Sequence, residues 1–108
     1  MALTPLISLN RCQPGRGTFV EIAGREIAVF VLGQPPTPHV IDNACPHANG
    51  NLSAGACTAE VVACPWHDWR FDLRTGACVD SPKVRVRRYK AEIRDGEVWV
   101  DLDSAGEP

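Results

Sequence analysis

Cysteine and histidine occur together in two short segments of this chain. The first is Cys45-Pro46-His47, and the second, Cys64-Pro65-Trp66-His67, begins after a further sixteen residues. A thiolate sulfur and a neutral imidazole nitrogen are both good ligands for transition metals. The Cys-x-His and Cys-x-x-His spacings allow the two side chains of one loop to reach the same site. The four side chains together therefore form a complete ligand set for a metal centre.

A Cys2His2 zinc site is one alternative for the same residues. Zinc fingers place two cysteines on one side of the site and two histidines on the other. Here each loop mixes thiol with imidazole, which suits a centre with two chemically different metal ions. A nucleophilic Cys–His pair is a weaker alternative, because it would leave the second pair without a role.

The other three cysteines have no histidine at ligand spacing, and we expect spectator thiols at Cys12, Cys57 and Cys78. A disulfide scaffold is disfavoured because the cysteine count of five is odd and the N-terminus shows no secretory signal. The reducing compartment that this implies favours metal binding over disulfides.

The elements that position these loops are predicted to be strands. Short runs rich in β-branched and aromatic residues alternate with turn signals, and no stretch shows a helical period. Ala23-Gly24 and Asp95-Gly96 are hairpin turns, and residues 25–31 are apolar enough for a strand buried on both faces. We expect strands over residues 4–9, 18–22, 25–31, 39–42, 61–63, 70–73, 84–93 (with a β-bulge near 87–88) and 98–102. The prediction is an all-β, antiparallel sandwich of about nine strands, from which two loops present the ligands.

Length and composition restrict the function classes. At 108 residues we expect one domain, residues 1–108, with a loose polar tail from Asp103 to Pro108. The net charge of −2 gives no basic field for nucleic acid. No apolar run approaches the roughly 20 residues that span a bilayer. We therefore expect a cytoplasmic protein that binds neither nucleic acid nor membrane.

The two loops resemble those of the Rieske [2Fe–2S] proteins, in which two cysteines hold one iron and two histidines the other. The resemblance rests on residues 45–52 (CPHANGNL) and 64–76 (CPWHDWRFDLRTG), and it extends to the framework strands around them. It implies the Rieske iron–sulfur fold and one [2Fe–2S] cluster. It further implies that Cys45 and Cys64 bind the inner iron, while His47 and His67 bind the outer iron through Nδ1.

Departures from the high-potential branch of that family are informative. That branch bridges its two loops with an extra cysteine pair, but Gly50 and Trp66 stand at those positions here. It also has hydroxyl donors to the cluster sulfurs, where this chain has Trp69 and Phe71. Fewer donors stabilise the added electron less, so we expect a potential at the low end of the Rieske range, roughly −150 mV.

Several other side chains allow a structural interpretation as well as a functional one. Trp66 and Trp69 either pack in the small core or shield the cluster and contact a partner. We expect His39 on the surface, and the basic run from Lys83 to Arg94 as a solvated strand face with a lesser part in partner docking. An acidic rim that attracts a basic reductase is expected from Asp42, Asp68, Asp72 and Asp80.

The resemblance predicts a one-electron carrier that connects a flavoprotein reductase with a terminal oxygenase. The chain has no nucleotide-binding fingerprint and no mononuclear iron motif, so we expect an electron-transfer component and not a complete enzyme. One alternative is the small subunit of an NAD(P)H-dependent nitrite reductase. Another is a non-redox interaction module that holds zinc or no metal.

Overall fold

The computed structural model describes residues 3–46, 49–66 and 69–104, and these ranges contain nine strands and no α-helix. The prediction of an all-β, antiparallel protein is confirmed. Three single-turn 3-10 helices, η1 (Leu9–Arg11), η2 (Leu52–Ala54) and η3 (Leu102–Ser104), complete the regular structure. No helix in these ranges is long and apolar enough to cross a membrane.

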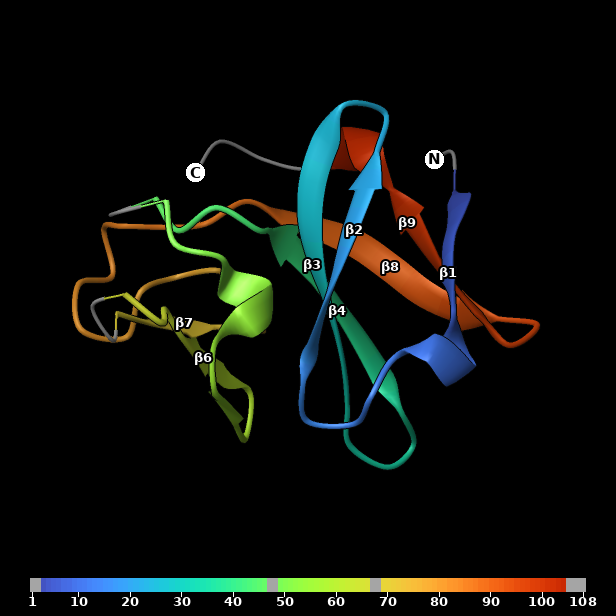
Figure 1. Ribbon diagram of the computed structural model, residues 1–108, viewed down its shortest axis with the longest axis horizontal. Coiled ribbons are helices and arrows are strands. Elements are labelled where there is room, and N and C mark those ends of the chain that lie inside the picture. Colours follow the sequence, from blue (N-terminus) through green and yellow to red (C-terminus); the bar gives the residue numbers. More distant parts are fainter. Residues whose placement is uncertain (1–2, 47–48, 67–68, 105–108) are drawn as a thin grey trace.

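Six strands form the larger sheet, in the order β1-β9-β8-β4-β3-β2 (Figure 1). Their bounds are β1 (Thr4–Ser8), β2 (Gly17–Ile22), β3 (Arg25–Leu32), β4 (Thr37–Asp42), β8 (Arg88–Arg94) and β9 (Glu97–Asp101). Two of the hairpins turn where the sequence predicts. Ala23 and Gly24 connect β2 to β3 with φ angles of 52° and 75°, and Asp95 and Gly96 connect β8 to β9 with 52° and 76°. Two consecutive residues with positive φ match the right-handed twist of the strands that they join.

Residues 43–87 form a smaller unit on one side of this sheet, which we call the small lobe (Figure 1). It is described except for residues 47–48 and 67–68. Its sheet has the order β5-β6-β7, with β5 (Cys57–Thr58), β6 (Val61–Ala63) and β7 (Arg70–Asp72). The lobe therefore contains both Cys/His segments, and the larger sheet supports it.

Two hydrophobic cores lie on opposite faces of β3 and β4. Ala28 and Phe30 face the small lobe and pack in a core that contains Leu52, Val62, Phe71 and Leu73. Ile27 and Val29 face the other way and pack with Val40, Tyr89, Val98 and Val100. Strand β3 is thus buried on both faces, as its continuous apolar sequence predicts.

The predicted strand over residues 84–93 is wrong in its first half. Strand β8 begins at Arg88, and the residues before it belong to the small lobe. Val86 packs in the lobe core, whereas Tyr89 packs in the core on the opposite face of the sheet. The apolar side chains stand at even-numbered positions up to Val86 and at odd-numbered positions from Tyr89. This change marks the passage of the chain from one core to the other, and not a bulge within one strand.

The expected loose tail does not include its first two residues. Residues 102–104 form η3, and the Ser104 hydroxyl accepts from the Lys90 N–H at 2.8 Å and donates to the Asp101 carbonyl at 2.6 Å. Asp103 and Ser104 are therefore ordered, which corrects the expectation for these two residues. Residues 105–108 lie outside the described part of the chain.

His39 is buried, with 5 % of its surface exposed, and not on the surface as predicted. It pairs with Phe30 across β3 and β4, so its side chain points toward the small lobe, as does that of Ile41 two residues later. Its Nε2 lies 3.7 Å from Glu60 Oε2, and neither ring nitrogen has a hydrogen-bond partner among the described residues. A buried imidazole without hydrogen-bond partners is uncommon inside a protein. Because burial disfavours the charged form, this environment favours the neutral imidazole.

The surroundings of His39 predict a pH dependence of stability. Burial lowers its pKa below the ordinary value of 6.5, more than Glu60 and Asp72 raise it, and Arg88 lowers it further. The unfolded chain then binds a proton first as pH falls, so the stabilisation present above about pH 6.5 is lost below it. We expect urea unfolding midpoints to fall from pH 7.5 to 5.0 in the native protein and to fall less in His39→Phe. An equal fall of the urea midpoint between pH 7.5 and 5.0 in the two proteins would contradict this account.

Candidate metal centre

Cys45 and Cys64 are delivered to the same core by two different strands. Cys45 follows β4 after two residues, and Cys64 directly follows β6. Both side chains are fully buried in the lobe core. The structure therefore brings the two predicted thiols into one apolar environment, where water has little access.

Each cysteine also starts a loop that closes on itself in the same way. The Cys45 N–H donates to the Gly50 carbonyl at 2.9 Å, and the Cys64 N–H donates to the Trp69 carbonyl at 2.7 Å. The carbonyl lies five residues after the cysteine in both loops. In the first loop, the Asn49 N–H also donates to the Cys45 carbonyl at 2.8 Å. The two segments therefore share the backbone bond that closes each loop, although their Cys–His spacings differ by one residue.

His47 and His67 lie outside the described residues, so the four-residue ligand set remains a prediction. Within the described ranges, no three His, Cys, Asp or Glu side chains are close enough to hold a metal ion.

The two loops contact each other at Gly50. A Cβ atom on this residue would lie 2.7 Å from the Cys64 sulfur and 3.3 Å from Cγ of Trp66. Both distances are shorter than ordinary contacts, so only glycine allows the second loop to approach the first this closely. The Trp66 side chain remains 63 % exposed. Two buried thiols on abutting loops are a donor set that fits a small metal–sulfur centre.

Asn43 holds the first loop in place, and sequence analysis assigned it no such role. It is almost fully buried, and its side chain donates to Asn51 Oδ1 at 2.9 Å and accepts from the Ser53 N–H at 3.0 Å. Its backbone N–H donates to the Glu26 carbonyl in β3 at 3.0 Å. Asn43 therefore connects the start and the end of the loop to the larger sheet. Because its side-chain partners lie eight and ten residues away, no local motif reveals this role.

The remaining cysteines differ in their surroundings. Cys78 is buried in the core that holds Cys45 and Cys64, whereas Cys12 is buried in the other core. Cys57 is half-buried, and burial raises the pKa of both the Cys12 and the Cys57 thiols. Their spectator role remains a prediction, and their protonated state is consistent with it.

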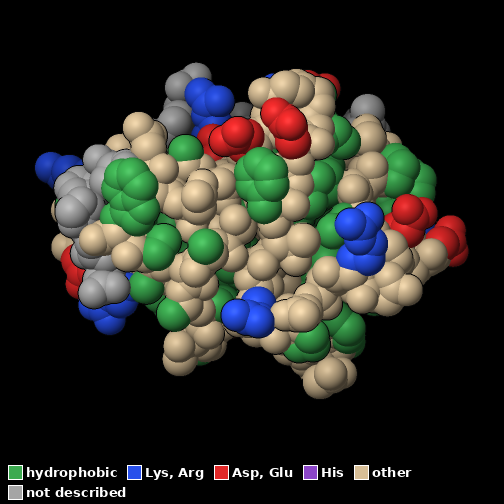
Figure 2. Space-filling model, viewed as in Figure 1, with side chains coloured by type: hydrophobic (Ala, Val, Ile, Leu, Met, Phe, Trp, Pro, Cys, Tyr) green, Lys and Arg blue, Asp and Glu red, His purple; other side chains and the backbone are tan. Residues whose placement is uncertain are grey.

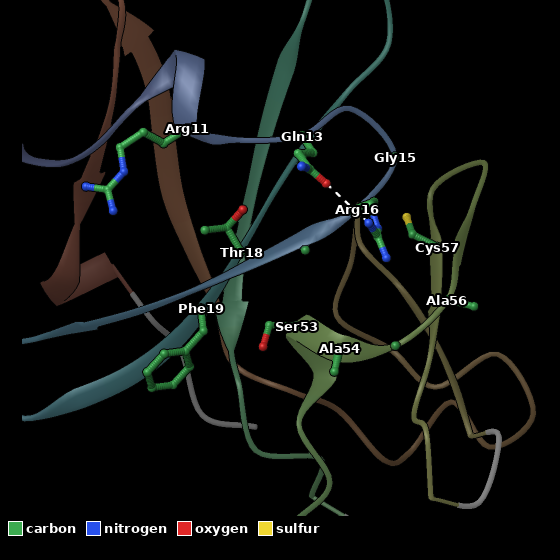
Figure 3. A pocket seen from close by; sticks show the side chains of 12 residues that line it. Arg11, Gln13, Gly15, Arg16, Thr18, Phe19, Ser53, Ala54, Ala56 and Cys57 are labelled. Carbon is green, nitrogen blue, oxygen red and sulfur yellow. Dashed lines mark hydrogen bonds between the residues drawn. The ribbon is translucent and has the colours of Figure 1, made fainter.

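Cys57 lies at a cleft of about 630 Å3 between the β1–β2 connection and the segment from η2 to β5 (Figure 3). Arg11 and Arg16 line it as well, and Arg16 donates to Gln13 Oε1 at 3.3 Å. No residue of either closed loop, 45–50 or 64–69, contributes to its described lining. The cleft is therefore separate from the candidate metal centre.

The expected acidic rim is not found among the described residues. Asp72 pairs with Arg74 at 3.0 Å, and Asp80 pairs with Arg70 at 2.7 Å. Asp42 accepts a hydrogen bond from the Tyr89 hydroxyl at 2.6 Å. These three carboxylates are each satisfied locally, and Asp68 lies outside the described residues. Arginine side chains neutralise Asp72 and Asp80, whereas the partner of Asp42 is a neutral hydroxyl.

The family described as "Rieske-like [2Fe-2S] domain" matches residues 2–101 of this chain. The ferredoxin component of the naphthalene 1,2-dioxygenase system from Pseudomonas putida is 31 % identical, and the match covers 89 % of this chain and 91 % of that protein. The oxygenase component of a 3-ketosteroid-9-alpha-monooxygenase from Rhodococcus rhodochrous is 32 % identical over 93 % of this chain. The chain spans only 27 % of that protein's length, and about a quarter of the length of two other oxygenase components to which it is similar.

Solved structures agree with these relatives. The ferredoxin of carbazole 1,9a-dioxygenase from Nocardioides aromaticivorans superposes with a TM-score of 0.81 at 33 % identity, covering 93 % of this chain and 97 % of that one. A protein described as the small subunit of an NADH-dependent nitrite reductase from Mycobacterium tuberculosis superposes with a TM-score of 0.83 at 27 % identity. Coverage there is 92 % of this chain and 93 % of that one.

The contact at Gly50 predicts the effect of one added methyl group. Gly50→Ala would push the Cys64 sulfur or the first loop aside, at about 1–3 kcal/mol, the usual range for an overpacked core. We expect a lower urea unfolding midpoint and iron content well below that of the native protein, measured by colorimetric assay. The control is Gly24→Ala, where a Cβ would meet no atom within 4 Å and only the positive φ opposes alanine. Iron retention in Gly50→Ala equal to that in Gly24→Ala would contradict the assigned contact.

Proposed function

Because this chain belongs to the family of Rieske-like [2Fe–2S] domains, we propose that it is a one-electron carrier between a flavoprotein reductase and a terminal oxygenase. Its cofactor is one Rieske [2Fe–2S] cluster. The observation that carries the proposal is the match to a ferredoxin component over nearly the full length of both chains. The family match also favours an iron–sulfur cluster over the zinc site considered from sequence.

We assign the cluster ligands to Cys45, His47, Cys64 and His67. The bound cluster supplies reversible transfer of one electron. The chain itself contributes two thiolates from a buried core, and backbone hydrogen bonds that hold both loops in place. Gly50 lets the loops approach, and the surrounding apolar side chains exclude water from the sulfur atoms.

The surroundings support a low potential. Phe71 is fully buried in the lobe core and has no hydroxyl, and Trp69, half-buried against the same core, has none either. Fewer hydrogen bonds to the sulfur atoms and less solvent stabilise the reduced cluster less, which puts the expected potential at roughly −150 mV. We also propose a cytoplasmic location, where reducing conditions keep the three remaining cysteines as thiols.

The small subunit of a nitrite reductase is a second candidate function. It is favoured by the superposition on the protein of that description from Mycobacterium tuberculosis. In that case the domain would serve one fixed large subunit instead of exchanging between two partners.

Substitution of single ligands tests the assignment. We expect Cys45→Ser and His67→Cys to lose the Rieske EPR spectrum, because each removes a ligand of the type that its iron requires. Cys12→Ser is the matched control and should keep the native spectrum, since Cys12 lies in the other core. A native spectrum in either of the first two variants would refute the ligand assignment.

Isolation of the tagged chain from its own cells distinguishes the two functions. A carrier is expected to purify with the Rieske spectrum alone and to titrate with one electron near the low end of the Rieske range. A reductase subunit would co-purify with a partner that contains flavin and sirohaem. Stoichiometric recovery of that partner would overturn the carrier function, and a midpoint potential well above zero would overturn the account of the cluster surroundings.

A further inference from the structure

Charge is unevenly distributed between the two parts of the molecule. The small lobe has five Lys and Arg residues against four Asp and Glu, whereas the rest of the chain has six against nine. The formal charge is therefore +1 in the lobe and −3 elsewhere, within a net charge of −2. The lobe cations are Arg70, Arg74, Lys83, Arg85 and Arg87.

The described acids of the lobe do not neutralise all of these cations. Asp72 and Asp80 are used by Arg74 and Arg70, and Glu60 faces the buried His39. Arg87 shares a depression with Glu21, Glu26 and Asp42 of the larger sheet. Lys83 and Arg85 remain without an acidic partner in the described part of the chain.

Lys83 and Arg85 are both exposed. The Arg85 guanidinium donates to the Thr75 carbonyl at 2.7 Å, and because this acceptor is uncharged, the positive charge of Arg85 is not neutralised.

Lys83 and Arg85 lie on a segment of the small lobe that starts beside the second cysteine loop at Val79 and passes opposite Ala77 at Arg85. The Val79 N–H donates to the Arg70 carbonyl, directly after the Trp69 carbonyl that closes that loop. Val84, between the two cations, packs against the core that contains Cys45 and Cys64. Figure 1 shows this segment in orange at the end of the molecule where the two loops lie, and Figure 2 shows basic side chains projecting from the same end.

The same end also has exposed apolar side chains. Trp66 is 63 % exposed and Val79 is 45 % exposed, and among the described residues the other exposed large apolar side chain, Phe19 at 49 %, lies at the separate cleft. Exposed apolar side chains and unpaired cations in the same lobe are a usual composition for a protein-binding surface.

We propose that the surface of Trp66, Val79, Lys83 and Arg85 binds a redox partner whose own docking surface is acidic. The inference rests on the proposed electron-carrier function and specifies the partner by charge. It replaces the acidic rim and basic reductase expected from sequence.

Local charge governs this encounter because salt screens distant charges. At 0.1 M ionic strength the screening length is about 10 Å, and the molecule is 36 Å long. A partner at the lobe therefore experiences mainly the charges of the lobe, among which Lys83 and Arg85 have no acidic partner in the described residues, although the whole protein is negative. The negative net charge predicts attraction of cations to the protein, whereas the local charge of the lobe predicts attraction of anions. The proposal can therefore be tested with small charged probes, without knowledge of the partner.

Two small oxidants of opposite charge serve as probes. The cluster-loaded protein is first reduced, and its oxidation is followed by stopped flow with ferricyanide, an anion, or hexaamminecobalt(III), a cation. Each oxidant takes one electron from the reduced cluster, which gives ferrocyanide or cobalt(II). From 10 to 300 mM NaCl we expect ferricyanide oxidation to slow by about tenfold and hexaamminecobalt(III) oxidation to accelerate.

Charge reversal provides matched variants. The double variant Lys83→Glu/Arg85→Glu should invert both salt dependences. The control, Arg11→Glu/Lys90→Glu, changes net charge by the same amount at two exposed positions of the larger unit and should leave both signs as in the native protein. The inference would be overturned if, in the native protein, added salt slowed oxidation by hexaamminecobalt(III) and accelerated oxidation by ferricyanide. Equal effects of the two double variants would also overturn it. The carrier function would stand in both cases. A protein without a reducible cluster would overturn both.

Discussion

The burial of β3 and β4 on both faces is the constraint on which the rest of the structure depends. One face of these strands supports the core of the larger sheet, and the other supports the small lobe. Neither core is complete without them, because Phe30 and Ile41 belong to one, and Val29 and Val40 to the other. The lobe has only short strands of its own, too short to form a stable sheet alone. The position of the cysteine loops therefore depends on β3 and β4, whose side chains share a core with Cys45 and Cys64.

The supporting contacts between the lobe and the sheet differ in chemistry. Asn43 connects the first loop to β3 through satisfied hydrogen bonds, while Arg88 donates to the Leu73 carbonyl at 2.9 Å. His39 faces the same boundary with both nitrogens unsatisfied among the described residues. The first two contacts fix the lobe, and the third makes the attachment sensitive to acid.

Local signals in the sequence predicted most of the fold. Turn pairs such as Ala23-Gly24 and the apolar run of β3 determine the local backbone conformation within a few residues. The turn and the strand could therefore be predicted from sequence alone. The errors concern residues whose surroundings come from distant parts of the chain. His39 is buried by Glu60 and the lobe, and the parity change before Tyr89 reflects two cores and not one bulged strand. The pairing of Asp72 and Asp80 with arginines also depends on side-chain positions that spacing does not give.

The glycine at the contact between the two loops has a consequence for assembly. A covalent bridge across the loops would require an oxidation step, and its timing would have to be coordinated with delivery of the inorganic centre. Gly50 packed beneath Trp66 and the Cys64 sulfur requires only burial, which is reversible. Contact between the loops therefore requires no prior oxidation of the chain. Assembly of the centre is thus compatible with a reducing compartment, in which thiols stay free.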